Sequence, residues 1–195
     1  MAHLSLKEKL HYWQARYLYA RLHMLFFAYT QRNSEKNLLE LVLPDAENFF
    51  QMTAGIPQID GQRRLLLDRF TAGDQACLVR QNNRTVHVSW WGERNRLSPE
   101  YELGPDCQWP LPEKSPVIYD CWTAHEARGK GLYPQVLMQL SNRLLDNYPS
   151  VWIYCLDSNL ASRRGIEKAG FKYRGTLTRT RLFGKFLKCS RDSEN

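Results

Sequence analysis

The sequence predicts a mixed α/β domain in which helices flank a central β-sheet, with an extra helix at the N-terminus. The first observation is a strand-like run at 117–123, which passes through a glycine-containing turn into apolar residues at helical spacing. The second is an apolar run at 151–156, which suits a buried strand and precedes a short helical stretch. The third is a pair of strand-like runs, at 171–180 and 182–189, that turn at Gly184.

Residues 4–22 are expected to form the extra helix, because apolar residues from Leu6 to Ala20 recur at spacings of three and four while basic residues occupy the other face. We expect this helix to pack on the domain or on a partner. Peripheral contact with a membrane surface is the alternative for a basic, aromatic-rich helix. The domain proper then covers 23–195, and its first segment, 23–31, fits either a strand or a continuation of the helix.

The next expected elements mix strands with helices. Expected strands cover 38–43, 76–80 and 85–91. One helix is expected to begin near Pro44-Asp45, and a second helix is expected over 59–70. Residues 92–115 are rich in proline, glycine and polar residues, so an irregular connection is expected there. A connection of that length inside a compact domain is usually functional or mobile.

The composition is that of a globular protein and excludes several classes. The chain is 43% hydrophobic and 24% charged, which does not fit a disordered or fibrous protein. No apolar run approaches the roughly 20 residues that a membrane-spanning helix needs, and we see no signal peptide. We therefore expect a cytoplasmic protein. The formal charge is +7, but basic and acidic residues are mixed along the chain, so a nucleic-acid partner is not expected.

The five cysteines are scattered along the chain, and no two of them have the spacing of a metal site. They are Cys77, Cys107, Cys121, Cys155 and Cys189. We therefore expect reduced thiols and no bound metal.

The stretch that joins the central strand to its helix has the composition of an anion-binding turn. Gly129 and Gly131 let the backbone approach a ligand without a Cβ in the way. The first N–H groups of the helix lack intrahelical partners, and the helix dipole places positive charge there. Arg128 and Lys130 add full charges. The pattern indicates a phosphate or pyrophosphate site, although it is neither a P-loop nor a dinucleotide fingerprint. A turn that binds nothing is the alternative.

Two motifs resemble those of the GNAT superfamily of acyl-CoA-dependent N-acyltransferases. The turn Arg128-Gly129-Lys130-Gly131-Leu132-Tyr133 is similar to the family's Arg-x-x-Gly-x-Gly/Ala turn, with Tyr133 in place of the last small residue. The segment 159–171 is similar to the family's Asn-x-x-Ser/Ala … Glu-Lys-x-Gly-Phe segment. The two motifs lie about thirty residues apart, with strand, helix and strand between them. The resemblance implies the GNAT fold.

The resemblance also implies acetyl-CoA, or another acyl-CoA, as co-substrate. In this family the pyrophosphate of coenzyme A binds the glycine turn and the helix behind it. The pantetheine arm lies along the central strand, which implies a slot between 120–123 and 153–156 where parallel strands splay apart. The residues implied for cofactor binding are Trp122, Thr123, Arg128, Gly129, Lys130, Gly131, Leu132, Tyr133, Asn159 and Ser162.

One frequent catalytic residue of the family has no counterpart here. The family's acid is a tyrosine just before the Glu-Lys-x-Gly-Phe segment, and this chain has Ile166 instead. Tyr154, Tyr173 or water would then protonate the leaving thiolate. Three tryptophans are candidates to line an acceptor site or to be core residues: Trp90, Trp91 and Trp109.

The candidate catalytic bases are Asp120 and Tyr119 on the central strand. Glu113 before that strand and His125 after it are further candidates. Each has a structural alternative: a hydrogen-bond partner for Asp120, a core aromatic residue for Tyr119 and a solvated loop residue for His125.

The resemblance, together with these observations, implies an N-acetyltransferase that moves an acetyl group from acetyl-CoA to a primary amine by direct attack on the thioester. We expect a small-molecule acceptor. One alternative is a protein N-acetyltransferase, and another is an acyl-CoA-binding sensor or interaction module without turnover. The sequence leaves a homodimer open.

Overall fold

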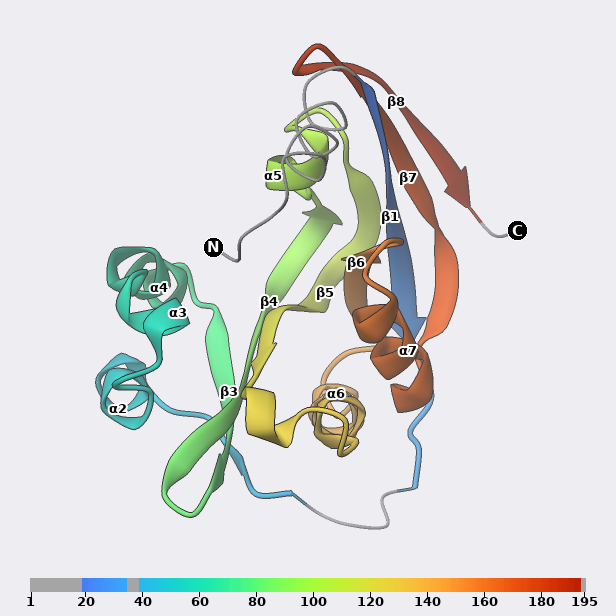
Figure 1. Cartoon of the computed structure of the whole chain (residues 1–195). Coiled ribbons are helices and arrows are strands. Elements are labelled where there is room, and N and C mark those ends of the chain that lie inside the picture. The colour runs from blue at the N-terminus through green and yellow to red at the C-terminus, as the bar shows by residue number, and fades with distance from the viewer. Residues whose placement is uncertain (1–18, 35–38, 194–195) are drawn as a thin grey trace.

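The computed structural model describes residues 19–34 and 39–193, and the strands among them form one mixed sheet in the order β2-β3-β4-β5-β6-β1-β7-β8 (Figure 1). The strands are β1 (Tyr19–Tyr29), β2 (Leu41–Val42), β3 (Gln75–Gln81), β4 (Arg84–Leu97), β5 (Trp109–Thr123), β6 (Val151–Leu156), β7 (Lys172–Leu182) and β8 (Lys185–Ser193). The helices are α2 (Ala46–Met52), α3 (Pro57–Asp60), α4 (Arg63–Thr71), α5 (Glu100–Leu103), the 3₁₀ helix η1 (His125–Ala127), α6 (Leu132–Leu144) and α7 (Leu160–Ala169). β5 and β6 are parallel, and the other neighbouring pairs are antiparallel.

The first described strand, β1, lies inside the sheet between β6 and β7. Its last six residues are all buried, which is typical of an inner strand covered on both faces and settles the alternative for 23–31 in favour of a strand. β1 begins at Tyr19, so the expected helix over 4–22 is wrong for 19–22. Those four residues pair with β7, and their exposure alternates with the period of two of a strand. The remainder of the expected helix lies outside the described residues.

The elements expected after residue 116 are confirmed. The two strands are β5 and β6, the helices that follow them are α6 and α7, and the final hairpin is the β7–β8 pair. The N-terminal half needs two further corrections. Of the expected strand at 38–43, the described residues 39–43 form only β2, and the expected helix at 59–70 is two helices, α3 and α4. Gly61 caps α3, and the chain re-enters the helical conformation only after Gln62.

The expected irregular connection at 92–115 is mostly regular structure. β4 continues to Leu97 and β5 already begins at Trp109, with α5 between them. The two strands stay paired through register shifts, one of them between Arg94 and Arg96. Proline lacks an amide donor and is tolerated at such irregularities, so a proline-rich composition does not exclude a strand here.

Cys107 and Cys189 form a disulfide, so the expectation of reduced thiols is wrong for these two residues. Their Cα atoms lie 5.7 Å apart although 82 positions separate them in the chain. The bond ties β8 to the segment that precedes β5. Because the pairing depends on the folded arrangement, spacing along the sequence could not reveal it. Cys77, Cys121 and Cys155 are free thiols.

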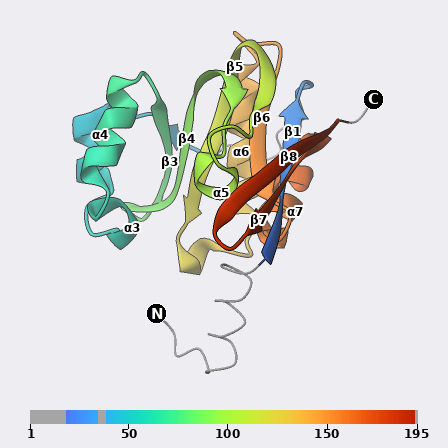
Figure 2. The same cartoon turned by 90° about the horizontal axis from the view of Figure 1, so that it is seen from above.

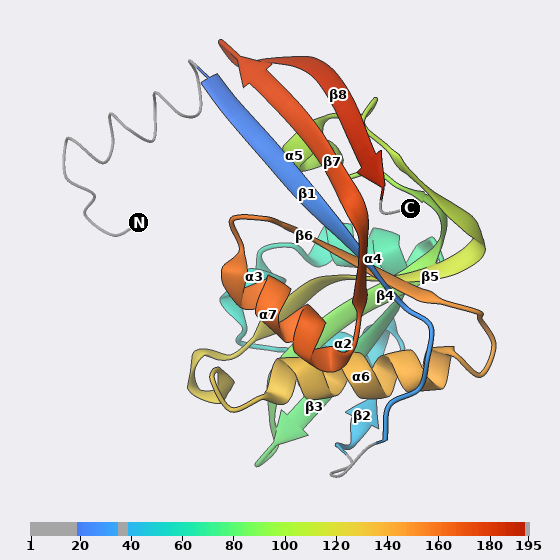
Figure 3. The ribbon, with the colours of Figure 1, turned by 90° about the vertical axis from the view of Figure 1, so that its right-hand side faces the viewer.

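Helices cover both faces of the sheet (Figures 2 and 3). α6 and α7 pack on one face over the largest apolar cluster, which includes Val136 and Ile166. α2, α3 and α4 pack on the opposite face over β3 and β4, around Trp90. A third cluster, around Leu103 and Trp109, lies beneath α5. Within residues 19–34 and 39–193, no helix combines the length and apolar character needed to cross a membrane.

The close approach of α6 and α7 depends on Gly165. A Cβ at this position would clash with the ring of Tyr133, the residue that departs from the small residue of the GNAT turn. The Tyr133 hydroxyl also lies 3.2 Å from the Oγ of Ser162, which is on α7 like Gly165. Gly165 therefore makes the room that a large side chain at position 133 requires.

Replacing Gly165 with alanine is expected to lower the free energy of unfolding by about 1–3 kcal/mol, because the new methyl group overpacks the interface between α6 and α7. Gly61→Ala is the control. Gly61 has an ordinary φ of −72°, and its Cβ would lie 3.6 Å from the Pro57 carbonyl oxygen. The control should stay within about 0.5 kcal/mol of the unaltered protein or stabilise it slightly. Urea unfolding measures both values, and equal effects would contradict the packing role of Gly165.

Candidate functional site

The parallel strands β5 and β6 separate in the middle of the sheet. Only two residue pairs join them, Val117 with Trp152 and Ile118 with Ile153. Just beyond, Asp120 has a left-handed backbone with φ of 47°, and the β4–β5 register shifts. A cleft of about 780 Å³ begins there, with 119–123 on one side and 153–156 on the other. The slot expected between these strands is therefore present.

The glycine turn and the start of α6 close one end of the cleft. Gly129 and Gly131 have φ values of 72° and 76°, which glycine adopts without strain, and a Cβ would meet nothing closer than 4.0 Å at either position. The described residues provide no hydrogen-bond acceptor for the backbone N–H groups of Gly129, Lys130 and Gly131. The Arg128 Nε donates to the Thr123 carbonyl at 2.9 Å, which fixes the turn against β5. The turn thus presents donors and positive charge together.

The start of α7 forms the opposite wall of the cleft. The Asn159 Oδ1 accepts from the Ser162 backbone N–H at 3.1 Å and caps the helix, which leaves the side-chain NH₂ available to a ligand. Arg164 and Lys168 on α7 also line this wall. They were not predicted from the sequence, since basic residues on the polar side of a helix usually only face solvent.

The structure gathers nine of the ten residues predicted to bind a cofactor around this one cleft. They are Trp122, Thr123, Arg128, Gly129, Gly131, Leu132, Tyr133, Asn159 and Ser162. Lys130 is exposed and is not among the lining residues.

The cleft passes between the separated strands and reaches the opposite face of the sheet, where Met24, Glu102, Tyr119 and Tyr154 line it. A second cavity of about 790 Å³ lies on that face, lined by 93–98, Lys114 and Val117 as well as by Tyr119 and Tyr154. The two tyrosines are shared by both cavities. The cleft and the second cavity therefore lie next to each other at these two side chains, which form the junction between them.

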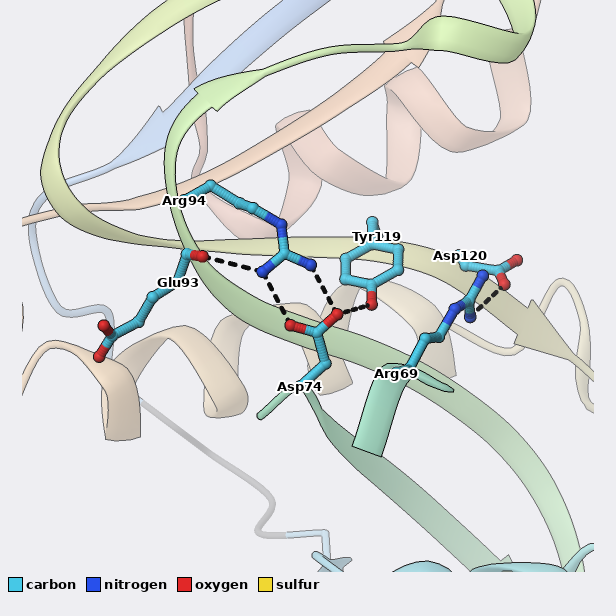
Figure 4. Close-up of polar contacts among 6 residues, drawn as sticks. All are labelled: Arg69, Asp74, Glu93, Arg94, Tyr119 and Asp120. Carbon is cyan, nitrogen blue, oxygen red and sulfur yellow. Dashed lines mark hydrogen bonds and ion pairs between the residues drawn. The ribbon is translucent and has the colours of Figure 1, made fainter. Parts of the chain in front are cut away.

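A buried carboxylate holds Tyr119 at this junction (Figure 4). Asp74 is only 4% exposed and accepts two hydrogen bonds from Arg94, at 2.8 and 2.5 Å, and one from the Tyr119 hydroxyl, at 2.5 Å. Burial and the neighbouring Asp74 carboxylate both raise the pKa of Tyr119. Tyr119 is therefore a neutral phenol whose proton points to Asp74, so it offers the cleft an acceptor oxygen rather than a base.

Asp120, the other predicted catalytic residue, lies next to this cluster and lines the cleft. Its Oδ2 accepts from the Arg69 Nη1 at 2.7 Å, and its side chain is 53% exposed. The Arg69 guanidinium also lies over the rings of Trp90 and Tyr119, at 5.1 Å from each centroid. Asp120 is thus an accessible carboxylate with a fixed orientation.

Three solved structures share this arrangement of elements. A GNAT-family acetyltransferase from Colwellia psychrerythraea matches with a TM-score of 0.54 and 14% identity, over 85% of this chain and 59% of that one. A protein from Novosphingobium aromaticivorans that is assigned to the GNAT acetyltransferases matches with a TM-score of 0.51 and 19% identity, over 85% of this chain and 65% of that one. The glucosamine N-acetyltransferase region of a fungal multi-domain beta-N-acetylglucosaminidase matches with a TM-score of 0.54 and 14% identity, over 88% of this chain and 22% of that one.

The chain has the GNAT fold. It spans about three fifths of the length of the two bacterial proteins. Neither the scan against protein-family models nor the search of curated proteins gave a match.

Ile166, which the motif resemblance aligns with the family's acidic tyrosine, is 0% exposed in the core and cannot transfer a proton. Tyr173 does not line either cavity, and its hydroxyl lies 2.6 Å from the Thr176 Oγ1. Tyr154 does line both, and its hydroxyl has no hydrogen-bond partner among the described residues. Burial raises the pKa of Tyr154 to about 12, so it is a neutral donor at the junction.

The two thiols in the cleft are poor nucleophiles. Burial raises the pKa of Cys121 to about 12 and that of Cys155 to about 11. Both are therefore protonated at neutral pH, and a thiol is much less reactive than a thiolate. This favours direct transfer of a group between two ligands over transfer through a cysteine.

His87 is a buried residue beside the cleft that the sequence reasoning missed. It is 0% exposed, with its Nδ1 2.8 Å from the Thr123 Oγ1 and its Nε2 2.6 Å from the Ser89 Oγ. Burial lowers the pKa of His87 to about 3, so the ring stays neutral. Only the folded pairing of β4 with β5 brings His87 opposite Thr123.

Several other candidates lie away from both cavities. Trp90 and Trp109 are core residues, 2% and 5% exposed, which decides between their two alternatives in favour of the core. Trp91 is half-buried and lines neither cavity, and His125 is an exposed residue of η1. The Glu113 side chain lies outside the described part of the structure. In the described ranges, no group of three His, Cys, Asp or Glu residues is placed to hold a metal ion.

The buried His87 predicts a specific dependence of stability on pH. In the unfolded chain the imidazole binds a proton near pH 6.5, whereas in the folded protein it stays neutral down to about pH 3. The unfolded state therefore binds more protons in this window, so the stability contribution is complete above pH 6.5 and is lost as the pH falls. When the pH falls from about 7.5 to about 5, the free energy of unfolding of the unaltered protein should decrease by about 2 kcal/mol more than that of His87→Gln, because glutamine does not titrate. Chemical unfolding at both pH values measures this, and parallel losses would show that His87 is not buried as described.

Proposed function

We propose that the chain is an acyl-CoA-dependent N-acyltransferase, which moves an acetyl group from acetyl-CoA to a primary amine of a small-molecule acceptor. The observation that carries this proposal is the cleft through the sheet, which has an anion-binding turn at one end and a junction of two tyrosines at the other. The GNAT acetyltransferases with the same fold support it at the level of the fold.

The residues at the turn fit the phosphates of a coenzyme A ester. The free N–H groups of 129–131 and the start of α6 would hold the pyrophosphate. Arg128 at the turn, and Arg164 and Lys168 on the facing helix α7, also line the cleft and would balance the negative charge. The cleft is also long enough to cross the sheet, as an extended pantetheine arm requires.

The walls of the cleft fit an arm with amide groups. Beyond Ile118, β5 has no pairing with β6, so the backbone groups on that edge of 120–123 can bond a ligand as a strand would. The free NH₂ of Asn159 lies on the facing wall. Thr123 is held by His87 and is not needed to bond the arm with its hydroxyl.

Bound acetyl-CoA supplies the acyl group: the amine nitrogen forms a bond to the carbonyl carbon, the carbon–sulfur bond breaks, and the sulfur takes up a proton. Asp120 is the proposed acceptor of the proton that the ammonium group loses before attack. Tyr119 would accept a hydrogen bond from the amine and orient it. Tyr154 would donate to the departing sulfur, in place of the tyrosine that Ile166 replaces.

A second candidate function is an acyl-CoA-binding module without turnover. The buried Ile166 favours it, since the position that carries the acid in many relatives cannot act here. The two functions differ in whether thiol is released once an amine is present.

Gly131→Glu is expected to weaken acetyl-CoA binding at least about 100-fold, because a carboxylate would stand where the pyrophosphate is proposed to bind. Gly184→Glu is a matched control, since Gly184 has the same φ of 76° and open space around it but lies in the β7–β8 hairpin. The control should bind acetyl-CoA normally. Isothermal titration gives both dissociation constants, and normal binding by Gly131→Glu would refute the assignment of the turn.

Tyr154→Phe is expected to lower kcat about 10- to 100-fold with little change in the KM for acetyl-CoA, because it removes a donor to the leaving sulfur. Tyr173→Phe removes a hydroxyl outside both cavities and should leave kcat unchanged. Thiol release in the presence of a panel of primary amines provides the measurement. An unchanged kcat for Tyr154→Phe would mean that water protonates the sulfur.

A further inference from the structure

The second cavity adjoins the cleft at the junction of Tyr119 and Tyr154, the two described residues that line both. It lies on the face of the sheet opposite to α6 and α7, between the part covered by α2–α4 and the part covered by α5. Its volume of about 790 Å³ falls in the range of small-molecule sites. A molecule in this cavity can present one end to the junction while the rest stays outside the cleft.

Positive side chains dominate the lining of this cavity. Arg94, Arg96 and Lys114 all contribute to it. The charge of Arg94 is already balanced by the buried Asp74. Arg96 and Lys114 are exposed and form no ion pair within the described residues, so their charges are available to a ligand.

The acidic residue of the lining is turned away from that charge. The Glu93 Oε1 accepts from the Tyr148 hydroxyl at 2.5 Å, and the carboxylate points away from Arg94 (Figure 4). Lys114 also has a left-handed backbone with φ of 54°, a conformation that non-glycine residues adopt at a cost. Two cations without partners and no facing carboxylate among the described lining residues leave a surplus of positive charge.

From this geometry we infer that the second cavity holds the acceptor, and that the acceptor is an amine which also carries a carboxylate or a phosphate. Arg96 and Lys114 bind the anionic group, and the amine end reaches Tyr119 and Tyr154. This inference rests on the proposed function in one respect, namely that the junction is where the amine meets the acyl group. The preference for an anion rests on the cavity itself and can be measured independently.

The test compares amines in matched pairs that differ in the anionic group. Glucosamine 6-phosphate with glucosamine tests the phosphate, and glycine with glycinamide tests the carboxylate. Each compound is titrated calorimetrically into the full chain, with and without saturating CoA, and then assayed for thiol release with acetyl-CoA. The same series is run on Arg96→Gln, on Lys114→Gln and on Lys188→Gln, an exposed lysine of β8 outside both cavities.

For at least one pair, the anionic member should bind at least about tenfold more tightly than its neutral partner, since a hydrogen bond to a charged group contributes about 1.5–3 kcal/mol. Arg96→Gln and Lys114→Gln should each lose about tenfold or more of that affinity while binding the neutral member within twofold of the unaltered protein. Lys188→Gln should change neither. Comparing each variant with the unaltered protein on the same amine removes differences in amine basicity.

The inference is overturned if no anionic amine binds, if the two members of each pair bind equally, or if Lys188→Gln loses as much affinity as the other variants. These outcomes are separable from failure of the proposed function. If acetyl-CoA does not bind, acyl transfer fails, while the titrations without CoA still decide whether the cavity prefers anions. If acetyl-CoA binds and the charge preference is absent, only the assignment of the acceptor fails.

Discussion

The separation of β5 from β6 after two residue pairs is the constraint on which the rest of the site depends. Backbone groups inside a sheet are normally paired, so ending the pairing in the middle leaves donors and acceptors that water or a ligand must satisfy. The left-handed Asp120 and the register shift between β4 and β5 turn β5 away from its neighbour at that point. The cleft is therefore a consequence of sheet geometry, and side chains only decide what it can hold.

The polar cluster around Asp74 keeps this geometry rigid. It joins the loop before β3 to β4 through Arg94 and to β5 through Tyr119. Arg69 adds an ion pair from α4 to Asp120, the left-handed residue at which β5 turns away from β6. A carboxylate that is 4% exposed is costly to bury unless its oxygens are fully bonded, so the cluster tolerates few alternative arrangements. This fixes Tyr119 at the point where the two cavities meet.

Local patterns in the sequence were enough to predict the glycine turn, α6, α7 and the last hairpin, because spacing and capping act within a few residues. They failed where distant segments decide the outcome. The pairing of Asp74 with Arg94, the contact of His87 with Thr123 and the Cys107–Cys189 disulfide all join separate parts of the chain. At 19–22, apolar spacing fits a helix as well as a strand, and only pairing with β7 decides for the strand.

The distribution of charge along the two cavities gives the proposed reaction a physical logic. The cleft carries Arg128, Arg164 and Lys168, and the second cavity carries Arg96 and Lys114. Near the junction, Tyr154 and the cleft thiols are neutral at pH 7, and Asp120 supplies a carboxylate. An anionic donor and an anionic acceptor repel each other, and binding each one to its own group of cations offsets that repulsion. Holding them there would bring the thioester and the amine together beside the half-buried Tyr154. There, a hydrogen bond from Tyr154 to developing charge on sulfur is stronger than it would be in water.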